Sequence, residues 1–261
     1  MADGISALAA RRRESPTSNP SWQAVPGSGA NRHSRAFDDL VGHPATADVV
    51  SLAKRRSVLG GGVKRWFDIV SAAAAIVLLL PLFSIIALAI KAWDGGPVFY
   101  RHRRVGLSGA AFDCLKFRTM VVDADDVLLR HLAASADAAR EWEETRKLKC
   151  DPRVTPLGSN MRKTSIDELP QLLNILKGEM SFVGPRPIVT AEVPKYGSCI
   201  DYYLRARPGL TGPWQVSGRN DVDYATRVAL DRRYIEEWSF WRDLAIIAKT
   251  VRVVITARGC Y

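Results

Sequence analysis

The longest uncharged stretch of the chain is residues 69–90, where apolar side chains occupy every face of a helix. About twenty such residues are enough to span a bilayer, whereas a soluble core helix is seldom apolar on all sides for so long. Pro81 lies near the middle of the stretch and removes a backbone donor, which favours a bend. The pattern predicts a membrane segment at residues 63–93, either a re-entrant helix-break-helix or a kinked single span.

Basic residues flank this segment on both sides. Lys64 and Arg65 precede it, and the cations that follow it are Lys91, Arg101, Arg103 and Arg104. The cytoplasmic loops of membrane proteins carry an excess of lysine and arginine, so basic flanks are compatible with both ends in the cytoplasm. A re-entrant segment fits this pattern, with Lys64, Arg65 and Pro81 as its anchor.

After this segment, the pattern changes to short strands and amphipathic helices. Strands are predicted at residues 98–100 and 112–120, which together make a small β-hairpin. Amphipathic helices are predicted at residues 123–149, 223–237 and 243–257. The last helix either lies in the membrane interface or packs against the folded domain. These elements indicate an α+β fold, with a small membrane-associated domain at residues 94–261.

A further short amphipathic helix is predicted within residues 162–187, the segment around which the other motifs are organised. Its helical spacing is carried by Leu169, Leu172, Leu173 and Leu176. Ser165 is a suitable N-cap, and Glu168 three residues later completes a capping box. The helix is expected to end at Gly178, and a short buried strand at residues 180–183 follows.

Two adjacent carboxylates, Asp167 and Glu168, fall in the first turn of this helix. The helix dipole and the free amides at that end stabilise anions and favour an ionised carboxylate. Arg162 lies just upstream and Arg186 follows the strand, so cations accompany the pair. This combination suits Mg²⁺, phosphate groups and a carboxylate nucleophile that attacks phosphorus. The plainer alternative is that Glu168 only completes the capping box.

Composition narrows the class of partner. Because 37 lysines and arginines outnumber 27 acidic residues, the net charge is +10, which implies nucleic acid, anionic lipid or a phosphorylated substrate as partner. The four cysteines are widely separated and form neither a metal-ligand spacing nor a disulfide framework, which indicates a reducing compartment. Residues 1–62 are polar and without periodicity, and predict a disordered cytoplasmic tail.

Several of these segments, taken in order, resemble the bacterial sugar transferase family. The matching features are Pro81 and the motifs at residues 64–68, 116–120, 150–158, 162–187, 207–212 and 215–219. These proteins are monotopic polyprenyl-phosphate phosphoglycosyl transferases, and the resemblance is to the exopolysaccharide-initiating type, from Val63 to the C-terminus. Leu80 departs from the family pattern, because a serine commonly precedes the proline of the membrane segment. Pro213 also departs from it, since a bulkier residue is expected there.

The resemblance implies a reaction and assigns residues to it. A sugar 1-phosphate, glucose or galactose, would pass from a UDP-sugar to undecaprenyl phosphate with release of UMP, through a covalent intermediate on Asp167. Asp167 and Glu168 would hold Mg²⁺. The cations that would bind the phosphates and the nucleotide are Lys116, Arg118, Arg162, Arg186, Arg207 and Arg219. The catalytic domain would face the cytoplasm from the bacterial inner membrane and would bind no nucleic acid, and homodimerisation is left open.

Two other functions are compatible with parts of the sequence. A membrane-tethered, non-enzymatic adaptor for anionic lipid or nucleic acid would explain the charge, but not the ordered motifs. A glycosyltransferase that moves only the sugar would release UDP in place of UMP. Residues 123–126 resemble the metal-binding motif of such enzymes, although acidic residues are also expected at the start of a helix.

Overall fold

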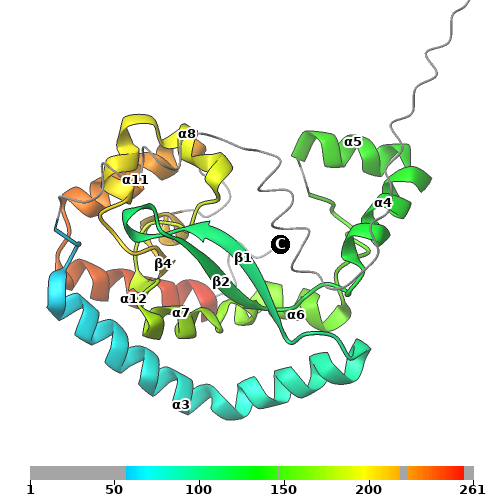
Figure 1. The fold of residues 1–261 in the computed structure, drawn as a ribbon, viewed down its shortest axis with the longest axis horizontal. Coiled ribbons are helices and arrows are strands. Elements are labelled where there is room, and N and C mark those ends of the chain that lie inside the picture. The colour runs from blue at the N-terminus through cyan, green and yellow to red at the C-terminus, as the bar shows by residue number, and fades with distance from the viewer. Residues whose placement is uncertain (1–56, 146, 218–222, 256–261) are drawn as a thin grey trace, which may run out of the picture.

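The computed structural model describes residues 57–145, 147–217 and 223–255. The predicted tail therefore lies outside the described residues, apart from its last six positions, and Arg219 lies outside them as well. The described chain combines helices with two small sheets (Figure 1), so the expected mixture of helix and sheet is confirmed.

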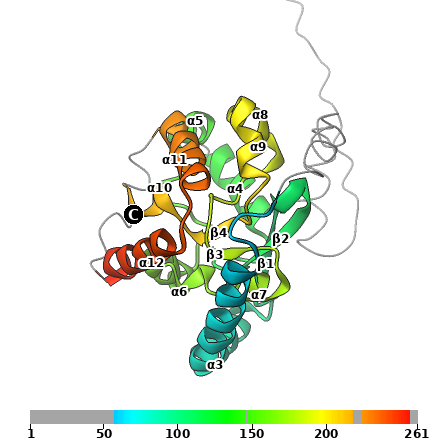
Figure 2. The ribbon, with the colours of Figure 1, turned by 90° about the vertical axis from the view of Figure 1, so that its left-hand side faces the viewer.

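Residues Gly61–Asp94 form one continuous helix, α3, along one edge of the molecule (Figures 1 and 2). The helix lies between Gly60 and Gly95, whose left-handed φ angles are 74° and 70°. The predicted break at Pro81 is not seen, because the helix continues through the proline and curves gently in Figure 1. Proline removes one backbone hydrogen bond, which bends a helix without ending it when the neighbouring turns stay intact.

Much of the apolar surface of α3 is exposed. The exposed large side chains are Val63, Trp66, Val70, Val77, Leu78, Leu80, Ile85, Leu88 and Trp93. In the part of the chain that the structure describes, α3 is the one helix whose length and apolar composition would allow it to cross a membrane. The core helix of a soluble domain would bury such residues, so this exposed surface is typical of a membrane-associated segment.

The predicted hairpin is confirmed. Strands β1 (Phe99–Val105) and β2 (Ala111–Phe117) pair antiparallel, with Tyr100 opposite Lys116. The first strand is longer than predicted, because the consecutive polar residues Arg101, His102, Arg103 and Arg104 hid the alternation of exposed and half-buried positions. The predicted strand before Arg186 is also present, as β3 (Ser181–Val183), which pairs in parallel with β4 (Gly209–Thr211).

Short helices fill the rest of the described chain. They are α4 (Ala124–Ala134), α5 (Ala136–Thr145), α6 (Pro156–Thr164), α7 (Gln171–Lys177), α8 (Val193–Tyr196), α9 (Ile200–Tyr203), α10 (Pro213–Val216), α11 (Tyr224–Glu236) and α12 (Phe240–Ile255), with 3₁₀ turns at Leu107–Gly109, Ile166–Glu168, Thr190–Glu192 and Gly197–Cys199. The single helix predicted at residues 123–149 is wrong, because Ser135 adopts an extended backbone between α4 and α5. Its Oγ accepts the Ala138 backbone N–H at 3.2 Å and so caps α5.

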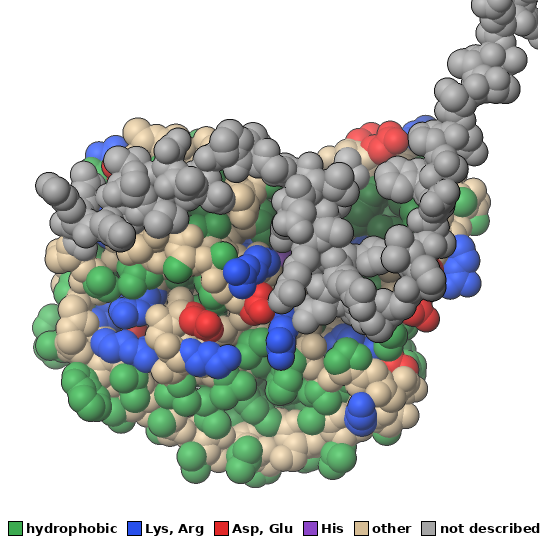
Figure 3. Space-filling model, viewed as in Figure 1, with side chains coloured by type: hydrophobic (Ala, Val, Ile, Leu, Met, Phe, Trp, Pro, Cys, Tyr) green, Lys and Arg blue, Asp and Glu red, His purple; other side chains and the backbone are tan. Residues whose placement is uncertain are grey.

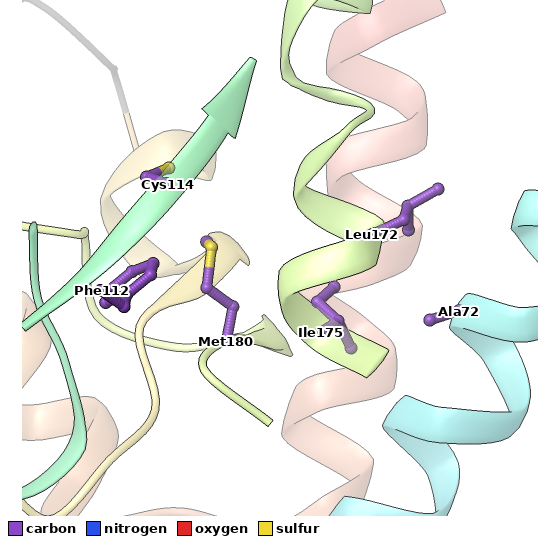
Figure 4. Close-up of a cluster of buried hydrophobic side chains, with 6 residues drawn as sticks. All are labelled: Ala72, Phe112, Cys114, Leu172, Ile175 and Met180. Atoms are coloured by element: carbon purple, nitrogen blue, oxygen red, sulfur yellow. The ribbon is translucent and has the colours of Figure 1, made fainter. Parts of the chain in front are cut away.

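The domain is attached to α3 by apolar packing. Figure 4 shows one cluster, which combines Ala72 of α3 and Leu172 and Ile175 of α7 with Phe112, Cys114 and Met180. In the second half of α3, Ile86 and Ile90 pack in the same way against Phe117 and Met161. Both halves of the long helix therefore contact the same folded domain.

The last helix, α12, has one side in the core. Ile246 is buried in a cluster with Val183 and Tyr234, whereas Trp241 is 77% exposed. Packing against the domain, one of the two alternatives for this helix, is therefore present in the structure. The exposed side leaves contact with a membrane as a prediction.

Gly184, which follows β3, offers a test of this fold. A Cβ at this position would lie 2.3 Å from the Arg207 carbonyl oxygen and 2.7 Å from the Gly209 nitrogen, so the β3–β4 pairing would have to shift. We expect Gly184→Ala to lower the free energy of unfolding by about 2 kcal/mol, measured by thermal unfolding in detergent. Gly62→Ala is the matched control, because its Cβ would meet nothing within 4 Å. Equal melting temperatures for the two variants would contradict the close approach.

Candidate active site

Asp167 and Glu168 lie in a tight turn between two helices. Helix α6 ends at Ser165, whose φ of 57° is left-handed, and Ile166–Glu168 form a 3₁₀ turn. The predicted capping box is wrong, because the Ser165 side chain makes no capping bond and α7 begins only at Gln171. Pro170 explains the difference, since it has no backbone N–H with which to join this turn to α7 as one helix.

A lysine from the hairpin pairs with both carboxylates. Lys116 Nζ lies 2.6 Å from Glu168 Oε1 and 4.0 Å from Asp167 Oδ2. Asp167 is only 8% exposed, whereas Glu168 is half-buried. Arg162, at the end of α6, donates from Nε to Thr119 Oγ1 at 2.9 Å, and its charge acts on Asp167. The structure thus brings together four residues predicted for the site: Lys116, Arg162, Asp167 and Glu168.

The protonation of Asp167 is governed mainly by burial. Desolvation raises the pKa of Asp167 to about 6, and the Glu168 charge adds to this, while Lys116 and Arg162 oppose it. The backbone hydrogen bond at this turn lowers the pKa, as expected for a carboxylate at a helix start, but desolvation outweighs it. At pH 7 the carboxylate is still ionised in a ratio of about ten to one. Burial opposes the charge of Lys116 too, but Glu168 and Asp167 raise its pKa, so this lysine is a cation.

Arg118 is placed elsewhere. Its guanidinium pairs with Asp94 at the end of α3, and its Nε donates to the Pro97 carbonyl at 2.7 Å. The predicted common face for Lys116 and Arg118 is not formed, because β2 ends at Phe117 and the chain then turns toward the end of α3. Arg118 therefore joins the hairpin to the long helix.

Arg186 belongs to a second group of charges beside the carboxylate pair. It donates to Glu192 at 3.0 Å and lies over the Trp214 ring, 5.6 Å from its centroid. His102 lies near both groups of charges. Burial lowers the pKa of His102 to about 4, and the positive charges of Lys116 and Arg186 contribute to this shift. Figure 3 shows basic and acidic side chains gathered on this face, above the apolar band of α3.

Arg207 lies at the opposite end of α7 from the carboxylate turn. Its Nε donates to the Gly178 carbonyl at 2.9 Å. Arg65 donates to the Ile175 and Leu176 carbonyls at the same helix end, and Lys64 is buried against Asp243. Of the residues predicted to form the anchor, two therefore bond to the domain.

Comparison with known proteins decides the family. The bacterial sugar transferase model matches residues 60–257. The chain is 55% identical over 203 residues to the "Exopolysaccharide production protein ExoY" of Rhizobium meliloti, which covers 78% of this chain and 90% of that protein. It is 51% identical over 211 residues to the "Undecaprenyl-phosphate galactose phosphotransferase" of Salmonella typhimurium, covering 81% of this chain and 44% of that protein. A third relative, the "UDP-glucose:undecaprenyl-phosphate glucose-1-phosphate transferase" of Caulobacter vibrioides, is 44% identical over 208 residues, covering 76% of this chain and 72% of that protein.

The chain belongs to the bacterial sugar transferase family. The predicted resemblance and the predicted enzyme class, a phosphoglycosyl transferase, are thereby confirmed. The alternative of a non-enzymatic adaptor is set aside, because this sequence matches a family of enzymes along most of its length.

The carboxylate pair of this sugar transferase suits a Mg²⁺ ion that is also bound by substrate phosphates. Within the described ranges, no group of three or more His, Cys, Asp or Glu side chains could enclose a metal ion. Mg²⁺, however, is commonly held by one or two carboxylates together with substrate phosphates. Asp167 and Glu168 therefore suit an ion that arrives with a diphosphate, and Lys116 would have to release Glu168 to admit it.

Sequence reasoning missed several residues beside the site of this transferase. They are His102, Arg104, Glu192 and Trp214. Alternation along β1 could have indicated two of them, because residues 100, 102 and 104 point to one side of a strand. Glu192 and Trp214 lie in short helical turns without periodicity, and only the tertiary structure brings them beside Arg186.

Proposed function

We propose that this transferase moves a hexose 1-phosphate, glucose or galactose, from a UDP-sugar to undecaprenyl phosphate and releases UMP, as the first step of exopolysaccharide assembly. The observation that carries the proposal is the buried Asp167 carboxylate, with Lys116 Nζ 4.0 Å from its Oδ2 and Glu168 beside it. The names of two relatives, a galactose and a glucose 1-phosphate transferase, support the choice of sugars.

The first half of the reaction is a displacement at phosphorus. An Asp167 oxygen attacks the phosphorus that carries the sugar and forms an acyl-phosphate bond, while the bond from that phosphorus to the bridging oxygen breaks. The electron pair leaves with UMP, which keeps the bridging oxygen. Burial suits this role, because a carboxylate of raised pKa is a better nucleophile than a fully solvated one and is still ionised at pH 7.

The second half regenerates the enzyme. A phosphate oxygen of undecaprenyl phosphate attacks the same phosphorus, the acyl-phosphate bond breaks, and the Asp167 carboxylate is restored. Lys116 and Arg162 would neutralise charge that develops on the phosphoryl oxygens. Bound Mg²⁺ would supply the remaining positive charge, with Glu168 as its main protein ligand. Arg186 would contact the donor nucleotide from its place beside Trp214.

Helix α3 supplies the membrane anchor in this proposal. Its exposed apolar side chains would be covered by lipid tails, with Trp66 and Trp93 at the interface. Contacts of both halves of the helix with one domain support a segment that enters and leaves on the same face, because a straight span would carry one end away from the domain. We therefore expect a monotopic protein in the inner membrane, with its catalytic domain in the cytoplasm.

The test is nucleotide release by purified protein in nanodiscs, with Mg²⁺, undecaprenyl phosphate and a panel of UDP-sugars. The proposal expects UMP release that requires the lipid, and the sugar that supports it identifies the donor. Release of UDP would instead indicate transfer of the sugar alone. The absence of release with any hexose donor, from protein that melts cooperatively, would contradict the assignment of donor and acceptor.

The pKa of Asp167 predicts the acid side of the pH profile. Only the ionised carboxylate attacks phosphorus, so kcat/KM should fall as the pH decreases through about 6, the pKa set by burial. The logarithm of kcat/KM should approach a slope of one below that point. A profile that is flat down to pH 5, at constant stability and membrane association, would contradict Asp167 as the group that titrates.

A further inference from the structure

The first two turns of α3 face inward with their charged side chains. Lys64 is 6% exposed and Asp68 is 1% exposed, and Arg65 is half-buried. Their apolar neighbours Val63 and Trp66 are each 69% exposed. A basic flank that served only to meet lipid headgroups would turn its cations outward. In this segment the charged side chains face the protein and the apolar side chains face outward, so the charged side chains have partners inside the protein.

Arg65 binds the C-terminal end of α7. Its Nη1 donates to the Ile175 carbonyl at 2.5 Å and its Nη2 to the Leu176 carbonyl at 2.8 Å. The last carbonyls of a helix have no donor in a following helical turn, and the two-pronged guanidinium donates to two of them, although the Ile175 carbonyl also accepts the Gly178 backbone N–H at 3.0 Å. Helix α7 has only seven residues and begins three residues after Glu168, so a displacement at this end is carried to the carboxylate turn over about 10 Å.

Asp68, one turn further along α3, binds the strand that leads to Arg186. Its Oδ1 accepts Ser181 Oγ and the Phe182 backbone N–H, each at 3.0 Å. Strand β3 ends at Val183, three residues before Arg186. One helical turn of α3 therefore fixes two segments, α7 and β3, that lie between the carboxylate turn and Arg186.

Lys64 connects the same part of α3 to the two C-terminal helices, α11 and α12. Its Nζ donates to Asp243 of α12, and Asp243 also accepts Tyr234 Oη at 2.7 Å and Trp238 Nε1 at 3.1 Å. Tyr234 Oη lies 3.1 Å from the Val183 carbonyl oxygen as well, so this buried network closes on β3. Buried polar side chains thus link α3, α12 and β3 in one network.

We propose that Lys64, Arg65 and Asp68 are positioning residues for the transfer reaction. Through their contacts, the orientation of α3 in the membrane determines the positions of Asp167 and Arg186. The inference rests on the proposed catalytic role of Asp167. A change in the tilt of α3 would move α7 and β3 together, because these side chains hold both. Residues 64–68 thus connect the membrane anchor to the active site, in addition to their part in membrane insertion.

The experiment measures kcat and donor KM for Arg65→Met in nanodiscs by UMP release. Removing both carbonyl contacts should lower kcat between about tenfold and a hundredfold, since a displacement of about 1 Å at a catalytic group has effects of that size. The donor KM should stay within about twofold, because Arg65 lies at the end of α7 opposite the carboxylate turn. Lys177→Met, which removes an exposed cation from the same helix end, is the matched control and should keep the wild-type kcat.

A second pair of variants separates positioning from a charge effect on insertion. Arg65→Lys keeps the charge but reaches only one carbonyl, and should recover part of the kcat. The double variant Val63→Arg with Arg65→Met restores the basic flank at an exposed position that faces away from α7, and should stay as impaired as Arg65→Met. Full recovery by the double variant, or wild-type kcat in Arg65→Lys and Arg65→Met alike, would overturn the inference. An inactive wild type would instead count against the proposed function.

Discussion

Asp167→Asn is expected to lower UMP release by at least about a thousandfold, because an amide cannot form the acyl-phosphate intermediate. The same substitution should leave the melting temperature unchanged or raise it. Burial lifts the pKa of this carboxyl from 3.8 to about 6, so the native state binds its proton more tightly than the unfolded state does. At pH 7 without Mg²⁺, holding the ionised form in the fold costs about 3 kcal/mol, at about 1.4 kcal/mol for each pKa unit.

The raised pKa of Asp167 also predicts how the stability of the protein changes with pH. Because the folded pKa is raised, the stability contributed by Asp167 is greatest below pH 4 and is lost as the pH rises through about 6. The difference in melting temperature between Asp167→Asn and wild type should therefore grow between these values. Glu143→Gln is the matched control, an exposed acidic residue in α5, and should change neither activity nor stability. Appreciable turnover by Asp167→Asn would rule out a nucleophilic role.

Lys116→Met is expected to lower kcat/KM by about a hundredfold or more, the effect of removing one charged group that stabilises developing negative charge. The loss should be accompanied by a shift in pH dependence. Lys116 lowers the pKa of Asp167, so without the lysine the acid side of the profile should move to higher pH. Parallel kcat/KM profiles of variant and wild type, recorded between pH 5 and about pH 8, show whether the shift occurs.

Arg103→Met serves as the control for that experiment. Arg103 lies on the same hairpin, but its side chain is exposed and its partner is Asp113. Its removal should lower the net charge equally without moving the profile. A shift of the same size in both variants would mean that general electrostatics, and not the contact with the carboxylate pair, sets the pKa of Asp167.

Local periodicity was sufficient to predict the hairpin, the end of α7 at Gly178, and helices α11 and α12. It failed where a single residue changes the backbone. Pro170 separates the Asp167 turn from α7, and Ser135 divides a continuous amphipathic pattern into α4 and α5. In both cases the pattern of apolar residues continues through the interruption, so spacing alone gives no signal.

The partners of the charged residues could not be predicted from the sequence either. Arg118 was assigned to the phosphates because it lies two residues from Lys116, but its partner is Asp94, which is 24 residues away in sequence. Lys64 was assigned to the membrane surface, although Asp243 holds it in the interior. Which cation faces the substrate, and how far burial raises the pKa of Asp167, depend on contacts between distant segments. These contacts follow from the packing of α3 and the hairpin, which the sequence pattern does not specify.

The outward apolar side of α3, together with its bonds to α7 and β3, has a kinetic consequence. An enzyme held at a fixed depth meets its lipid substrate by lateral diffusion in the plane of the bilayer, and its soluble substrate by diffusion from the bulk. The rate should then depend on the mole fraction of undecaprenyl phosphate in the membrane and stay constant when more vesicles of the same composition are added. Diluting the acceptor with inert lipid should slow the enzyme, even when the total amount of acceptor in the sample is unchanged.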